Sequence, residues 1–408
     1  MSVPLFNLTR QNDALRPALE ETFARILASG HFIMGPDVSA LEAECAAYAG
    51  IEPEQVIGVS SGTDALLLAL MTAGIGPGDE VILPSFTFFA TAGCVARVGA
   101  TPVFVDSCPV CFNLDPDAVM SAITPRTKAI IPVHLFGQCA EMDRLLAVAS
   151  ERGLTVIEDA AQAFGARYRG QPAGTMGDFG AFSFFPTKNL GGFGDGGLLF
   201  VKDPEVAQRA RILRVHGGQP KYYHALIGGN FRLDSVQAGL IRVKLPHYDD
   251  YTRARQENAS FYLDQLGPEK GFILSGLDDC TCPVEGPGAP AREGASRTIT
   301  LPCAYPHNTH IWNQFTLLVD GPGADDGSLR NALRSFLQDR EIGSEIYYPV
   351  PLHAQECFPP APGEIRPALP VAESLSRRCL SIPIFPELST TEKEEVVAAL
   401  RAWVGETA

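Results

Sequence analysis

Short, nearly continuous apolar segments alternate with helical segments between about residues 55 and 205. The apolar segments are Val56–Val59, Glu80–Pro84, Pro102–Asp106, Lys128–Val133, Leu154–Glu158, Gly180–Phe184 and Gly197–Val201. Such segments are typical of strands covered on both faces, and residues 65–73 and 142–152 are predicted as intervening helices. The alternation predicts an α/β fold with a mostly parallel sheet and helices on both of its faces.

The pattern changes after about residue 245. Residues 249–266 are predicted as a long helix, and residues 276–298, rich in Gly, Pro, Cys and Ala, as a long loop or insertion. A strand at 311–319, a helix at 328–340, a strand near 344–347 and a helix at 391–403, which Ser389 or Thr390 could cap, complete the chain. We therefore predict a large α/β domain over residues 1–245 and a smaller α+β domain over residues 246–408.

Composition narrows the classes of function. The 408 residues are 46% apolar, enough for a large core, and no segment approaches the roughly 18 apolar residues that a membrane helix needs. The net charge of −15 argues against general nucleic-acid binding, which needs a basic face. Because the N-terminus lacks the layout of a signal peptide, we predict a cytoplasmic protein.

Ten cysteines are present, with two close pairs, Cys108 with Cys111 and Cys280 with Cys282. A zinc site is one interpretation, but the second pair has the wrong spacing for a zinc knuckle and no pair of histidines lies near it. Loop cysteines and small buried apolar side chains are the favoured interpretation, so no metal is predicted.

Three segments contain candidate chemistry. Ser60-Ser61-Gly62-Thr63-Asp64 follows a predicted strand and begins a helix, where free backbone N–H groups and the helix dipole favour a phosphate. An ordinary helix cap needs the same residue types, so this segment alone does not indicate a binding site.

The second segment is Glu158-Asp159-Ala-Ala-Gln162, at the end of a predicted central strand. Ligands of α/β folds bind at that edge of the sheet, and Gln162 lies about one helical turn beyond Asp159. An aspartate there could be a metal ligand, a base or the partner of a protonated ring nitrogen, and a solvated strand end is the alternative.

The third segment places Lys188 between an apolar strand and a glycine-rich turn. A lysine that loses water there has a lowered pKa and can react with carbonyl groups, whereas a surface lysine is the alternative. Gly192–Gly197 matches the G-x-G-x-x-G pattern. It follows a loop and runs into a strand, so it does not indicate a dinucleotide site.

A phosphate cradle, a carboxylate and a lysine on one α/β domain are what pyridoxal phosphate requires. The phosphate anchors this cofactor, the lysine forms a Schiff base with it, and the acid holds the proton of the ring nitrogen. The sequence therefore predicts a pyridoxal phosphate enzyme.

Over nearly its whole length the chain resembles the DegT/DnrJ/EryC1/StrS family of fold type I sugar aminotransferases. The resemblance is strongest in SSGTDALLLAL, GDEVILPSFTFFAT, GATPVFVD, PVHLFGQ, VIEDAAQAFGA, GDFGAFSFFPTKNLGGFGDGG and GGNFRLDSVQAG. It implies a mostly parallel seven-stranded sheet with a smaller C-terminal α+β domain. It also implies amino transfer from L-glutamate to a nucleotide-linked keto sugar, in a homodimer with shared active sites. The segment 108–111 and the segment 276–298 depart from the family pattern, and the second puts the sugar in question.

The resemblance assigns a role to each matching position. Lys188 would be the Schiff-base lysine and would move protons, and Asp159 would pair with the ring nitrogen. Gln162 would lie near the phenolic oxygen of the cofactor, and Phe88 would stack on its ring. The phosphate would be held by Gly62, Thr63 and Ser183, and by Asn230 of the other subunit.

Candidate substrate contacts are His134, His216 and Tyr348, for which packing is an equally good interpretation. Lys221 and Arg232 are candidate donors to a diphosphate, with a solvated surface charge as the alternative. Residues 221–234 and 243–248 resemble members that make 3-amino sugars, so carbon 3 is preferred to carbon 4. Two other functions are alternatives. A sugar dehydratase of the same family would lack the lysine, whereas Lys188 is present. A scaffold that binds pyridoxal phosphate without turnover would not need the catalytic residues.

Overall fold

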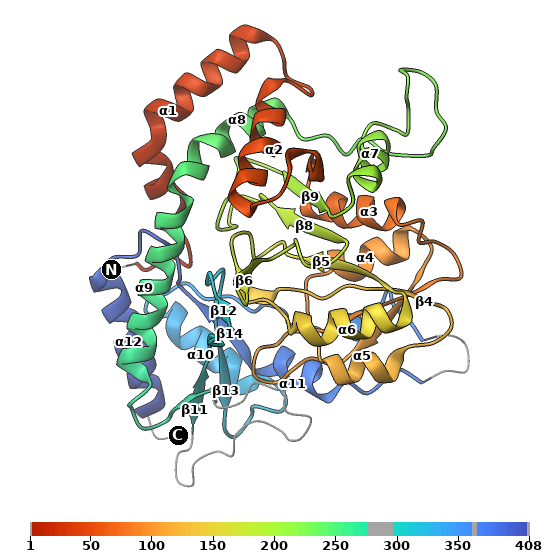
Figure 1. Ribbon diagram of the computed structural model, residues 1–408. Helices are drawn as coiled ribbons and strands as arrows, with labels where there is room; N and C mark the ends of the chain where they lie inside the picture. Colours follow the sequence, from red (N-terminus) through yellow and green to blue (C-terminus); the bar gives the residue numbers. More distant parts are fainter. Residues whose placement is uncertain (1, 276–296, 361–364, 406–408) are drawn as a thin grey trace.

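The computed structural model describes residues 2–275, 297–360 and 365–405 (Figure 1). Its twelve helices within these ranges are α1 Leu8–Ser29, α2 Pro36–Ala49, α3 Gly62–Thr72, α4 Ala90–Arg97, α5 Pro116–Ala122, α6 Met142–Arg152, α7 Pro204–Leu213, α8 Ser235–Lys244, α9 Tyr248–Leu266, α10 Ser328–Gln338, α11 Pro370–Arg378 and α12 Thr390–Gly405. No helix in the described ranges is both long and apolar enough to cross a bilayer.

A seven-stranded sheet forms the centre of the first half of the chain. Its strand order is β1-β9-β8-β5-β4-β2-β3, and β9 runs antiparallel to both of its neighbours while the strands from β8 to β3 are parallel. The strands are β1 Val56–Val59, β2 Glu80–Pro84, β3 Thr101–Val105, β4 Thr127–Ile130, β5 Thr155–Asp159, β8 Phe179–Ser183 and β9 Gly197–Val201. The predicted mostly parallel sheet of seven strands is confirmed.

Both faces of this sheet are buried because adjacent side chains of each strand enter different cores. In β2, Ile82 packs with residues of α2, α5 and α6, whereas Val81 and Leu83 pack with residues of α3, α4 and α7. Two-sided burial is the reason that the strands are continuously apolar in the sequence. It also leaves the strand ends as the place where polar side chains can be exposed.

A second sheet lies in the C-terminal part of the chain, in the order β10-β11-β13-β14. Its strands are β10 Phe272–Leu274, β11 Thr298–Leu301, β13 Phe315–Asp320 and β14 Cys379–Ile382. Residues of α9, α10 and α12 pack on it, and Val3 from the other end of the chain joins the same core. A small sheet of β12 Asn308–Thr309, β6 Arg167–Tyr168 and β7 Gln171–Pro172 connects the two halves of the sequence.

In the second half, one strand prediction was right only in part and one was wrong. Of residues 311–319, only those from Phe315 onward are in a strand, because the preceding residues bend towards the cavity described below. Residues 344–347 form no strand; Glu345 makes a single bridge with Ser381 in β14, a strand that the apolar pattern did not predict.

The helices at 249–266, 328–340 and 391–403 are confirmed as α9, α10 and α12. Ser389 caps α12: its hydroxyl accepts from the backbone N–H of Glu392 at 3.3 Å, and the Glu392 carboxylate accepts from the N–H of Ser389 at 2.8 Å. The predicted loop at 276–298 lies outside the described residues up to residue 296, and Thr298 begins β11. The division into domains near residue 245 stays a prediction.

Candidate active site

A cavity of about 440 Å³ opens where the parallel strands of the central sheet end. Five segments of the first half of the chain line it, together with two segments of the second half. Its polar and aromatic lining comprises Ser61, Gly62, Thr63, Thr87, Phe88, Asp159, Gln162, Ser183, Phe185, Thr187, Lys188, Asp195, Asn313, Gln314, Tyr347 and Tyr348. The three predicted segments of candidate chemistry therefore meet in one place.

The N-terminus of α3 forms one wall. The Ser61 hydroxyl caps the helix by accepting from the backbone N–H of Asp64 at 3.0 Å. Gly62 and Thr63 follow in the first turn, where backbone N–H groups have no partner within the helix. A Cβ added to Gly62 would lie 2.9 Å from the Cβ of Ser183, so only glycine lets the helix start this close to β8. This wall suits a phosphate.

Asp159 ends β5 and is 5% exposed. The Thr91 hydroxyl donates to its Oδ2 at 2.7 Å, and the backbone N–H of Ala161 donates to its Oδ1 at 3.3 Å. Burial raises the pKa of the Asp159 carboxyl, while these hydrogen bonds and the charge of Lys188 oppose the rise. A cationic group in the cavity would stabilise the carboxylate.

Glu158, the neighbouring carboxylate, points away from the cavity because successive side chains of a strand alternate. Its oxygens accept from the backbone N–H groups of Gly174, Met176 and Gly177 at 2.6–2.8 Å, and one of them lies 2.7 Å from Nε2 of His134. Only one of the two adjacent acids is therefore available to a ligand.

Lys188 is partly buried in the loop between β8 and β9, and its side chain lines the cavity. Burial lowers the pKa of Lys188 from 10.5 to about 8, and the negative charge of Asp159 acts in the other direction. At pH 7 about a tenth of the side chain is then the free amine, which is the reactive form.

Gln162 and Tyr348 are hydrogen-bonded at the side of the cavity. The Gln162 oxygen accepts from the backbone N–H of Phe136 at 2.7 Å, and its amide nitrogen donates to the Tyr348 hydroxyl at 3.2 Å. Burial raises the pKa of the Tyr348 hydroxyl, so it stays protonated. The ring of Phe88, half exposed, lies 6.1 Å from that of Tyr348 and offers a face to a planar ligand.

Five predicted site residues do not line this cavity. His134 is fully buried, with Nδ1 accepting from the backbone N–H of Ala140 at 3.2 Å and Nε2 facing Glu158, so it has no surface for a substrate. The other four lie on or beside the exposed segment 219–230, which precedes α8. They are His216, Lys221, Asn230 and Arg232.

Sequence reasoning missed several polar residues at the site, among them Thr91, Asn313 and Gln314. Thr91 holds Asp159 and follows Phe88 at helical spacing, a signal that could have found it. Asn313 and Gln314 line the cavity from residues that the apolar pattern assigned to a strand. The cysteines lie elsewhere: Cys108, Cys111 and Cys303 are buried together beside Tyr305, and Cys280 and Cys282 lie outside the described residues. Across the described ranges, no group of three potential ligands is placed to hold a metal ion.

The model of the DegT/DnrJ/EryC1/StrS aminotransferase family matches residues 14–280 and 293–401. The chain belongs to this family. It is therefore an aminotransferase, as the sequence predicted. The unmatched residues 281–292 fall within the predicted insertion at 276–298.

Relatives in the DegT/DnrJ/EryC1/StrS family match along the full chain. The dTDP-3-amino-3,4,6-trideoxy-alpha-D-glucose transaminase of Streptomyces venezuelae is 42% identical over 403 residues, 98% of this chain and 96% of its own. The UDP-N-acetyl-3-dehydro-alpha-D-glucosamine 3-aminotransferase of Acidithiobacillus ferrooxidans is 41% identical over 400 residues, 98% of this chain and 97% of its own. The crystal structure of S. venezuelae DesV in complex with a ketimine intermediate is 41% identical with a TM-score of 0.86, covering 100% of both chains.

The family depends on pyridoxal phosphate, and the cavity fits this group. Gly62 lets α3 start close against β8 beside Ser183, and the free backbone N–H groups of this first helical turn suit the phosphate. Asp159 is a buried acid with two hydrogen bonds and no ion pair among the described residues, which suits a protonated ring nitrogen. Lys188, with its lowered pKa, suits the carbonyl group.

Proposed function

We propose that this aminotransferase transfers an amino group from L-glutamate to a nucleotide-linked keto sugar, at carbon 3 of the sugar. The observation that carries the proposal is the meeting of Lys188, Asp159 and the N-terminus of α3 in one cavity. The two relatives described above, whose names specify nucleotide-linked sugars and position 3, support the substrate.

Pyridoxal phosphate, when bound, would supply an electron-poor ring that takes up negative charge from the reacting carbon. Gly62, Thr63 and Ser183 would bind the phosphate, and Phe88 would contact one face of the ring. The Asp159 carboxylate would hold the proton on the ring nitrogen, and Thr91 keeps this carboxylate oriented. Gln162 would orient the phenolic oxygen from its position beside Tyr348.

Lys188 would move the protons of the reaction. Its amine removes the proton from the α carbon of the donor, and later returns a proton to the carbon of the sugar that receives the amino group. The lowered pKa of Lys188 keeps a useful fraction of the side chain able to accept a proton near neutral pH. The apolar and aromatic lining of the cavity limits water near this amine.

Asn230 does not line the cavity of its own chain, and it lies on an exposed segment. We infer that this segment reaches the cavity of a second copy, where Asn230 contacts the phosphate. His216, Lys221 and Arg232 lie on or beside the same segment and would approach the nucleotide-linked end of the substrate there. In a chain of net charge −15, such local donors are needed to hold a diphosphate.

The catalytic assignment is tested with the variant Lys188→Ala. With glutamate and a nucleotide-linked 3-keto sugar, release of 2-oxoglutarate should fall at least about a thousandfold, because the proton carrier is removed. Lys202→Ala is the matched control, since Lys202 donates to the backbone of Met176 at 3.4 Å and does not line the cavity. Turnover by Lys188→Ala at the rate of this control would contradict the assignment.

A further inference from the structure

A second lysine, Lys244 at the end of α8, is buried with no ion pair among the described residues, and the charge of Glu387 acts on it only from a distance. Its side chain is 2% exposed, and within the described ranges no carboxylate oxygen lies within 4.0 Å of its nitrogen. Burial lowers the pKa of Lys244 to about 8, so it is mostly charged at neutral pH. Burying an ammonium is costly, and an apolar side chain of similar volume would fill the same space without that cost. The presence of an ammonium at this buried position therefore needs a functional explanation.

Lys244 contacts the loop of residues 184–196, which contains Lys188 and is called the catalytic loop below. Its Nζ donates to the backbone carbonyl of Gly191 at 2.9 Å, and it lies 4.5 Å from the ring centroid of Phe193. Gly191 is three residues after Lys188. The ammonium thus fixes a carbonyl of the catalytic loop and makes a cation–π contact with the same loop.

This loop is tightly closed, so a shift at Gly191 cannot remain local. The backbone N–H of Lys188 donates to the carbonyl of Phe185 at 2.8 Å, and that of Gly192 donates to the carbonyl of Phe184 at 2.7 Å. A Cβ at Gly191 would lie 2.2 Å from the carbonyl oxygen of Pro186. Displacing the Gly191 carbonyl would therefore displace Lys188.

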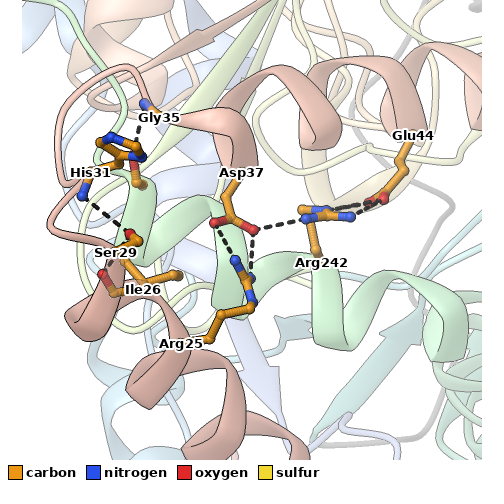
Figure 2. A network of polar contacts seen from close by, with 9 residues as sticks. Arg25, Ile26, Ser29, His31, Gly35, Asp37, Glu44 and Arg242 are labelled. Atoms are coloured by element: carbon orange, nitrogen blue, oxygen red, sulfur yellow. Dashed lines mark hydrogen bonds and ion pairs between the residues drawn. The ribbon is translucent and has the colours of Figure 1, made fainter.

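The helix that presents Lys244 is itself fixed from its other side. Arg242 of α8 pairs with Asp37 at 2.8 Å and with Glu44 at 2.7 Å, both in α2, and Asp37 also pairs with Arg25 of α1 (Figure 2). Gln237 of α8 adds a second contact to the loop, accepting from the backbone N–H of Phe193 at 2.8 Å. Helix α8 thus connects α1 and α2 to the catalytic loop.

We propose that Lys244 is a positioning residue for Lys188. Its ammonium holds the Gly191 carbonyl against α8 and thereby keeps the amine of Lys188 at the reacting carbon. The proposal rests on the catalytic role proposed for Lys188, but not on the identity of the sugar. A displacement of about 1 Å at a reacting group can lower a rate by about a hundredfold.

The test compares Lys244→Met with the control Lys202→Met, which removes a lysine-to-carbonyl hydrogen bond far from the catalytic loop. The first readout is hydrogen exchange of the full chain, with and without pyridoxal phosphate. Lys244→Met should reduce the protection of the amides between residues 185 and 196 about tenfold or more, and the control should not. Unchanged protection of this segment would overturn the proposal.

The second readout is the rate of the reaction with glutamate, divided by the amount of bound cofactor. In Lys244→Met the maximal rate should fall about 10- to 100-fold, while the glutamate concentration at half-maximal rate changes less than about twofold. A fall explained entirely by lost cofactor or lost folded protein would show that Lys244 is only structural, and would overturn the proposal.

Two further arrangements keep the test decisive. If Lys244→Met does not fold, Lys244→Gln replaces it, because its amide is one bond too short to reach Gly191 and the same losses are expected. If the wild-type protein does not react with glutamate, the proposed donor is wrong, and the exchange of residues 185–196 still tests Lys244 by itself.

Discussion

At the scale of single residues, two adjacent acids of β5 face opposite sides because successive side chains of a strand alternate. Asp159 faces the cavity, and Glu158 accepts three backbone N–H groups and faces His134 on the other side of β5. The apolar pattern places both at a strand end, and only the family resemblance selects Asp159 as the acid that faces the cofactor. The same strand geometry turns His134, a candidate for substrate contact, into a buried partner of Glu158.

The pH dependence of stability should reveal the buried charge of Lys244. The pKa of Lys244 is about 8 in the folded protein and 10.5 when unfolded, so between these values the unfolded chain binds more protons. The free energy of unfolding should therefore gain about 2 kcal/mol from this residue between pH 8 and pH 10. Urea unfolding of the cofactor-loaded protein should show this rise in the wild type relative to Lys244→Met. A rise of equal size in both proteins would mean that Lys244 is not a buried cation.

At the scale of elements, the start of α3 is the part of the site that depends most on close packing. Replacing Gly62 with alanine puts a Cβ 2.9 Å from the Cβ of Ser183, so the helix start or β8 must shift. We expect the dissociation constant of pyridoxal phosphate to rise at least tenfold, which is about 1.4 kcal/mol.

Titration of the cofactor absorbance measures this change in binding. The control is Gly74→Ala, where nothing lies within 4 Å of the added Cβ, although its positive φ will cost some stability. Equal affinities in Gly62→Ala and the wild type would contradict the proposed phosphate site.

The elements that could be predicted are those whose burial is continuous or periodic. The strands of the central sheet and helices such as α6 and α9 follow from apolar patterning alone. The conformation of residues 311–314 could not be predicted. Ile311 and Trp312 are apolar as in a strand, but the chain bends there and brings Asn313 and Gln314 to the cavity. Local patterning does not record that tertiary requirement.

At the scale of the whole molecule, the single chain exposes apolar side chains that a partner would cover. Phe23 and Leu27 lie one turn apart on α1 and are 47% and 59% exposed, and Ile33 after the helix is 52% exposed. Together with the exposed segment around Asn230, this surface supports the proposed homodimer.

Light scattering should give twice the 43.8 kDa mass of the chain at micromolar concentrations. Leu27→Glu should weaken the dimer at least about tenfold because it places a charge in an apolar contact, whereas Leu27→Met should not. A monomeric wild-type protein that turns over substrate would contradict the shared active site.

The most direct test of the proposed function separates the two halves of the reaction. The enzyme is loaded with pyridoxal phosphate, converted with glutamate to the form that holds the amino group, and freed of excess donor. Nucleotide-linked 3-keto and 4-keto sugars are then added separately while the absorbance of the bound cofactor is followed. The account predicts that the original absorbance returns with the 3-keto sugar alone. Its return with the 4-keto sugar alone would contradict the assigned carbon, and an absorbance that glutamate leaves unchanged would contradict the assigned donor.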